Sequence, residues 1–172
     1  LDFLASTGKP LILSTGMSAL NQVQDSVDFL AGIWAKSGKH ASDLLAILHC
    51  VSAYPAAPEA ANLRAIELLR SIFPQNVVGY SDHTLGIQAC VSAAAIGARI
   101  IEKHFTISKT QSAFRDHSLS ADPKDFRELV DRIREQELYL GSAVKVVLEQ
   151  EKAIESAARR AVLLRKDLPK GH

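Results

Sequence analysis

The stretch VVGYSDHTLGIQACVSAAAIGARIIEKH, residues 77–104, decides the fold. It opens with the short apolar run Val77–Ser81, continues through the Ala-rich segment Leu85–Gly97, and closes with a second apolar run, Arg99–Lys103. Short apolar runs are typical of strands that are covered on both faces, and small side chains let a helix pack closely on a sheet. The stretch therefore predicts a strand, a crossover helix and a second strand parallel to the first.

The same pattern continues outward in both directions. We expect further strands at residues 10–14 and 44–50, further helices at 18–36, 58–73 and 123–140, and a polar loop at 108–122. Four βα units fit either an open doubly wound sheet or a β/α barrel. Neither G-x-G-x-x-G nor a Walker A motif is present, which disfavours nucleotide-binding sheets. A complete barrel needs roughly 250 residues in eight units, so four units would form half of one.

The C-terminal tail has a different character from the βα repeat. Residues 145–158 are compatible with a helix, 159–165 with a strand or an extended linker, and 166–171 with a turn. We therefore divide the chain into a barrel part, residues 1–142, and a helix-and-linker part, residues 143–172. The ends of the sequence resemble those of a piece cut from a longer protein.

Composition indicates a globular protein of the cytoplasm. The 172 residues are 47% hydrophobic and 23% charged, with a net charge of +1, so no strong field attracts nucleic acid or an anionic membrane. The chain has two cysteines, too few for a disulfide framework, and this low number is typical of proteins from a reducing compartment. No apolar run is long enough to span a membrane, and the N-terminus lacks the basic start and cleavage site of a signal peptide.

Two histidines at neighbouring strand ends predict a metal site. Because side chains alternate along a strand, Ser81 shares a face with His83, and Glu102 shares a face with His104. In a barrel, the carboxyl ends of the strands carry the active site. Imidazole suits Mn, Fe, Co, Ni or Zn, whereas the alternative is a pair of hydrogen-bonded polar side chains. Glu102 would orient a ring, bind substrate or move a proton, or else form an ion pair with Lys or Arg.

Hydroxyl groups gather at the same strand ends. Ser14 lies at a strand-to-helix turn, where a helix N-terminus offers N–H groups to an anion, and Ser52 and Ser81 extend the same rim. These residues make phosphate binding credible, although Ser14 would also serve as a helix cap. Tyr54 follows the second strand and is placed to reach over the pocket, or else packs within its loop.

Other polar residues are expected to be structural or receive no role from the pattern. His49 and Asp82 lie on the opposite strand faces, toward the outer helices, and Asp82 is expected to cap the next helix. Asp116 and His117 lie in the long polar loop, where functional residues are common, but the pattern alone does not assign them.

Taken together, these residues resemble those of the N-acetylneuraminate (sialic acid) synthase family. Four motifs occur in the family's order and spacing, and residues 159–160 and 167–171 are similar to the linker that leads to its C-terminal antifreeze-like domain. The motifs are KPLILSTGM at 9–17, LHCVSAYP at 48–55, GYSDHTL at 79–85 and IEKHFT at 101–106. The resemblance implies a (β/α)8 TIM-type barrel, of which this chain covers about the last four βα units.

The resemblance also implies an activity and a set of site residues. The family condenses phosphoenolpyruvate with an open-chain N-acetylated amino sugar, N-acetylmannosamine or a relative, and releases phosphate and a nonulosonic (sialic-type) acid. It works as a homodimer on these small molecules. By this resemblance His83 and His104 hold a divalent metal, most simply Mn²⁺, and Ser14 and Ser81 contact phosphoenolpyruvate. The positions of Tyr54, Glu102 and Asp116 lie on the sugar side or near the reacting centre.

The chain departs from the family in several places. Ser52 stands where some members carry Asn, and residues 114–117 read Phe-Arg-Asp-His where the family often has Gly-Pro-Asp-His. The resemblance places the lysines for phosphoenolpyruvate in the preceding βα units. Two alternatives therefore stay open: a non-catalytic half-barrel that needs a partner chain to cover its sheet edges, and a metal-dependent barrel hydrolase.

Overall fold

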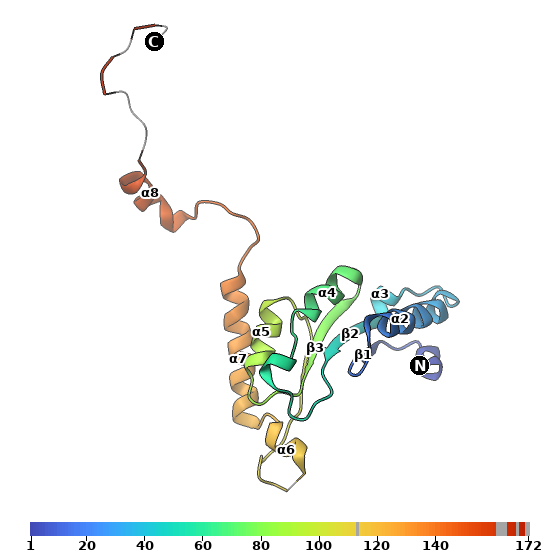
Figure 1. Ribbon diagram of the computed structural model, residues 1–172. Coiled ribbons are helices and arrows are strands. Elements are labelled where there is room, and N and C mark those ends of the chain that lie inside the picture. The colour runs from blue at the N-terminus through green and yellow to red at the C-terminus, as the bar shows by residue number, and fades with distance from the viewer. Residues whose placement is uncertain (113, 161–164, 168, 171–172) are drawn as a thin grey trace. The chain divides into compact units, whose positions relative to one another are not determined.

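The computed structural model describes residues 1–112, 114–160, 165–167 and 169–170 (Figure 1). The chain forms two compact units, Leu1–Leu140 and Gly141–His172. The second unit contains the short 3₁₀ helix η2, Glu149–Glu151, which leads directly into α8, Lys152–Ala158. The helix expected at 145–158 thus begins later than predicted. Much of the strand or linker and of the turn expected beyond residue 159 lies outside the described residues.

The first unit is built on a sheet of four parallel strands, β1-β2-β3-β4 in order. The strands are β1 (Leu11–Ser14), β2 (Leu45–Cys50), β3 (Val77–Asp82) and β4 (Ile101–Lys103). In a doubly wound sheet the strand order reverses at a switch point, whereas in a barrel each strand pairs with its neighbours in sequence. The four strands therefore form part of a TIM-type α/β barrel, as the sequence resemblance implied.

A longer helix follows each strand, and shorter ones precede β1 or lie in the connections. The longer helices are α2 (Leu20–Ala35), α4 (Ala65–Ile72), α5 (Gln88–Ala95) and α7 (Pro123–Leu140); the shorter ones are α1 (Asp2–Ser6), α3 (Ala41–Leu44), η1 (Pro58–Ala60) and α6 (Arg115–Leu119). Asp122 caps α7, because its carboxylate accepts hydrogen bonds from the N–H groups of Lys124 and Asp125. In the described part of the chain, no helix combines the length and apolar character that crossing a membrane requires.

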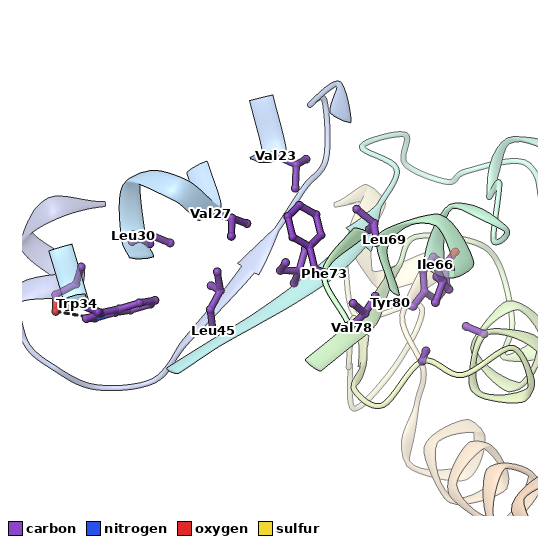
Figure 2. Packing of buried hydrophobic residues seen from close by; sticks show 14 residues of the cluster. Val23, Val27, Leu30, Trp34, Leu45, Ile66, Leu69, Phe73, Val78 and Tyr80 are labelled. Carbon is purple, nitrogen blue, oxygen red and sulfur yellow. Dashed lines mark hydrogen bonds between the residues drawn. The ribbon is translucent and has the colours of Figure 1, made fainter. Parts of the chain in front are cut away.

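The hydrophobic core fills the space between the sheet and the helices (Figure 2). Its largest member, Trp34 of α2, is fully buried and donates its indole N–H to the carbonyl of Ala5 at 3.1 Å. This hydrogen bond attaches α1 to α2. The same cluster takes odd-numbered residues from β2 and even-numbered ones from β3, such as Ile47 and Val78. These strand residues therefore define the helix-covered face of the sheet.

The opposite face of the sheet, here called the inner face, is partly open. Register places Ser14 beside Leu48, Cys50 beside Ser81, and Ser81 beside Glu102, so these residues share that face. Ile12 also lies there and is 60% exposed. The alternation expected from the sequence is thus present, with polar residues at the carboxyl ends of the strands.

Three parts of the predicted helix pattern were wrong. The helix expected at 58–73 is divided into η1 and α4, because Asn62 adopts a left-handed backbone conformation with φ 44° between them. The helices α1 and α3 were not expected. The loop predicted at 108–122 contains the short helix α6.

Gly79 is required where β3 passes between its neighbours. A Cβ added there would lie 2.5 Å from the backbone oxygen of Ile100 and 2.5 Å from Cδ2 of Leu48. We expect Gly79→Ala to lower the free energy of unfolding by about 1–3 kcal/mol, because a well-packed core tolerates extra volume poorly. Urea denaturation monitored by circular dichroism measures this change.

The matched control is Gly32→Ala in the exposed middle of α2. A Cβ at Gly32 would meet nothing within 4 Å, so Ala should raise the free energy of unfolding by about 0.5–1 kcal/mol through its better helix propensity. A loss at Gly79 no larger than the change at Gly32 would contradict the packing argument.

Candidate active site at the strand ends

Five of the sequence-predicted residues lie together on the inner face. They come from the ends of β3 and β4 and from the loop after β2, and comprise Tyr54, Ser81, His83, Glu102 and His104. This set is called the inner-face cluster below. The register of β3 and β4 explains the grouping, because Ser81 pairs with Glu102 and the two histidines each follow two residues later.

The two imidazole rings of the cluster lie side by side. The ring centroids of His83 and His104 are 5.2 Å apart, with the planes inclined at 61°. Nδ1 of His83 lies 2.7 Å from the carbonyl oxygen of Val51. A carbonyl only accepts, so Nδ1 must carry the proton, and Nε2 is left with a free lone pair. His83 is therefore prepared as an Nε2 ligand.

The two imidazoles of His83 and His104 fit a catalytic metal site, which keeps coordination positions open, better than a structural site, in which protein ligands fill every position. Among the described residues, no group of three His, Cys, Asp or Glu side chains gathers closely enough to hold an ion alone. Two imidazoles would leave several coordination positions for substrate, water or groups from elsewhere. The residues present are thus compatible with an open site, and both the binding of a metal and the identity of the ion stay predictions.

Tyr54 lies over the imidazole pair. Its ring centroid is 4.1 Å from that of His83 and 5.9 Å from that of His104. The loop that carries Tyr54 is fixed to β3, because the N–H of Ala56 donates to the carbonyl of His83 at 2.9 Å. The tyrosine ring therefore covers one side of the site and is held there by backbone contacts.

Ser81 and Glu102 form a short polar contact beneath the histidines. Ser81 is buried and donates its hydroxyl to Oε1 of Glu102 at 2.6 Å. Glu102 pairs with no Lys or Arg of the described chain, so the ion-pair alternative for this carboxylate is not what the structure shows. This hydrogen bond fixes the orientation of the serine hydroxyl.

Ser14 and Ser52 lie on the β1–β2 side rather than in the inner-face cluster. Ser52 lines a cavity of about 640 Å³ between the strand ends and α2, together with Thr15 and Cys50. A side chain at Gly16 would collide with the Ser52 hydroxyl, so the glycine permits this close approach. Ser14 is exposed at the end of β1. A link to the cluster runs through Cys50, whose Sγ is 3.8 Å from Nδ1 of His83.

Asp116 lies on the helix α6, in a loop that folds back on the end of β4. The N–H of Ala121 donates to the carbonyl of His104 at 2.8 Å. Nδ1 of His117 and the buried hydroxyl of Thr106 lie 2.8 Å apart. The sequence pattern left His117 without a role, and the structure shows it anchoring the loop that carries Asp116. The approach of Asp116 to the imidazole pair stays a prediction.

On the helix-covered face, one prediction is confirmed and one is wrong. His49 is buried, donates from Nε2 to the carbonyl of Ala61 at 2.9 Å and stacks on Tyr80, so it is structural as expected. Asp82 does not cap α5. It is instead the centre of a buried polar group that includes Lys103, with an Nζ–Oδ2 distance of 2.8 Å.

The charged state of Asp82 is set by its neighbours. Burial opposes ionisation, but hydrogen bonds from Lys103 and from the N–H of Thr84 outweigh it and hold the pKa of the carboxyl below its usual range. Burial and the nearby Asp82 charge both raise the pKa of the Tyr80 phenol and of the Cys90 thiol. Asp82 is thus an ionised acceptor surrounded by neutral donors and one cation.

Comparison with known proteins connects this geometry to one family. A model described as the NeuB family matches residues 1–145. The chain is 43% identical over 171 residues to an N,N'-diacetyllegionaminic acid synthase of Legionella pneumophila, covering 99% of this chain and 47% of that protein. It is 34% identical over 171 residues to an N-acetylneuraminate-9-phosphate synthase of Homo sapiens, covering 99% and 45%.

A solved structure shares the fold. The N-acetylneuraminic acid (sialic acid) synthetase of Leptospira borgpetersenii superposes with a TM-score of 0.77 at 32% sequence identity, over 93% of this chain and 54% of that one. The chain spans about half the length of the curated relatives it matches.

Proposed function

The chain belongs to the NeuB family, and on that premise we propose that its protein condenses phosphoenolpyruvate with an N-acetylated amino sugar. The products are a nonulosonic acid and phosphate. One observation carries the proposal: the His83–His104 pair lies at the carboxyl ends of adjacent barrel strands, beneath Tyr54. That is the end of the barrel where catalytic groups of this fold gather.

The bond changes assign a task to each group of the cluster. C3 of phosphoenolpyruvate forms a bond to the sugar aldehyde carbon, water adds at C2, and phosphate leaves from C2. A divalent metal bound by His83 and His104, most simply Mn²⁺, would supply Lewis-acid polarisation of the aldehyde oxygen. Ser81 is proposed to contact phosphoenolpyruvate, for which its hydroxyl hydrogen must turn from Glu102, its acceptor in this structure, toward the anion. Tyr54 orients the sugar and limits access of water from its side.

The remaining residues are proposed to contact the substrates from outside this cluster. Ser14 and Ser52 border the phosphate side, where hydroxyls and helix N-terminal N–H groups favour an anion. Asp116 is proposed to contact the sugar from the loop that His117 anchors. We further propose that the protein is a homodimer and acts in the cytoplasm.

The acceptor sugar defines the test of this proposal. The similar proteins named above differ in product: a diacetylated legionaminic acid, a 9-phosphorylated neuraminate and neuraminate itself. We expect the complete gene product to release phosphate from phosphoenolpyruvate in the presence of MnCl₂ and at least one N-acetylated amino sugar of a panel. Omission of the sugar is the control. Absence of phosphate release with every acceptor would refute the proposed function.

A second candidate is a non-catalytic half-barrel that requires another chain. Two observations favour it: Ile12 is exposed on the inner face, and β1 and β4 form the two edges of the sheet among the described residues. Phosphate release by the isolated 172-residue chain, at even a small fraction of the rate of the complete gene product, would eliminate this candidate.

A further inference from the structure

A buried ion pair lies directly behind the two histidines. Asp82 and Lys103 are register partners at the ends of β3 and β4, and each immediately precedes one histidine of the inner-face cluster. Nζ of Lys103 is 2.8 Å from Oδ2 of Asp82, and the two side chains are 1% and 0% exposed. Because side chains alternate, the pair faces the helices while His83 and His104 face inward.

Lys103 contacts the residues on both sides of His83. Besides the Asp82 carboxylate, its ammonium donates to the carbonyl of Thr84 at 2.5 Å. Oδ1 of Asp82 in turn accepts the N–H of Thr84 at 2.9 Å. The residues on either side of His83, through the Asp82 carboxylate and the Thr84 carbonyl, are therefore held by one cation that belongs to the strand of His104.

The carboxylate of Asp82 is saturated by donors. Four groups donate to it from β3, β4, α5 and the turn after β3, namely Tyr80, Thr84, Cys90 and Lys103. Such a network has directional hydrogen bonds at every oxygen lone pair, so it restricts the relative position of the two strand ends more than apolar packing does.

We propose that Asp82 and Lys103 are positioning residues, which set the spacing and orientation of His83 and His104 for binding one divalent ion. The inference rests on the metal-dependent function proposed above. A need for stability does not explain a buried ion pair well, because well-packed apolar residues of the same size often give the fold equal stability. The pair's place, one residue before each imidazole, indicates a geometric task.

The experiment measures Mn²⁺ affinity in the complete gene product. Asp82→Asn/Lys103→Met removes both charges together, so no buried charge is left unpaired, and Lys103→Met removes the cation alone. Mn²⁺ binding is followed by electron paramagnetic resonance with MnCl₂ alone, without substrates. We expect the Kd of both folded variants to rise about tenfold or more, as is typical when groups that orient metal ligands are lost.

The matched control is Leu30→Ala, which opens a cavity in the fully buried core beneath α2. It should lower the thermal midpoint but leave the Kd for Mn²⁺ within about twofold of the unaltered protein, since it touches no group near the histidines. Unchanged affinity in the folded double variant, or equal loss in Leu30→Ala, would overturn the inference. Absence of Mn²⁺ binding by the unaltered protein would overturn it together with the ligand assignment, while the phosphate-release assay tests the condensation separately.

Discussion

Replacing His83 or His104 with Ala in the complete gene product should lower the rate of phosphate release by about a thousandfold. A bound metal stabilises developing charge by several kcal/mol, and about 4 kcal/mol corresponds to this factor. By the proposal, each imidazole would supply one of the two ligands from the inner-face cluster, and their ring centroids lie 5.2 Å apart. Initial rates measured over a range of MnCl₂ concentrations, with the best acceptor, test the expectation.

His40→Ala is the control for this pair. His40 is exposed in the connection before α3 and lies outside the inner-face cluster, so its loss should leave both rate and Mn²⁺ affinity unchanged. Near-normal turnover and affinity in either His83→Ala or His104→Ala would show that the residue is not a ligand. The same result in both variants would remove the metal from the proposal.

The grouping of the histidines was predictable because it depends on local rules. Alternation along a strand places Ser81 with His83 and Glu102 with His104, and parallel neighbours bring their carboxyl ends to one edge. The structure agrees, through the Ser81–Glu102 hydrogen bond and the ring contact of the two histidines. Sequence spacing of one βα unit was sufficient, since adjacent strands in this fold are consecutive in the chain.

The partner of Asp82 was not predictable from the same rules. Parity placed Asp82 on the helix-covered face, and an Asp after a strand is usually a cap or turn residue. Its ion pair with Lys103 depends on the exact register of β3 against β4, which is a tertiary property. The fact that Lys103 lies one residue before His104, just as Asp82 lies one residue before His83, is the sequence signal that would have indicated the pair.

Other differences arise where tertiary contacts override a local pattern. The apolar periodicity of 58–73 predicts one helix, but the left-handed conformation of Asn62 ends the first turn before α4 begins. Ser52 lines the cavity beside α2, where the lack of a side chain at Gly16 permits its close approach, and its assignment to a common rim with Ser81 stays a prediction.

Lys103→Met alone should be strongly destabilising, with a loss of about 3–5 kcal/mol in the free energy of unfolding. Removing one member of a buried ion pair leaves the other charge without its partner in a medium that solvates it poorly. Asp82 is 0% exposed on its side chain, and three neutral donors remain around it. Urea denaturation of the complete gene product measures the loss.

The double variant separates the cost of an unpaired charge from the loss of the contact. In Asp82→Asn/Lys103→Met no charge remains in the pocket, so the loss should be smaller than for Lys103→Met by at least about 1 kcal/mol, because a neutral amide is less costly to bury than a carboxylate. Equal losses in the single and double variants would mean that the ion pair contributes through packing alone. If the double variant instead loses less stability but still binds Mn²⁺ more weakly, the contribution of the pair to stability and its positioning of the imidazoles are separate. The strand ends would then remain folded but would no longer hold the imidazoles at the spacing that the metal requires.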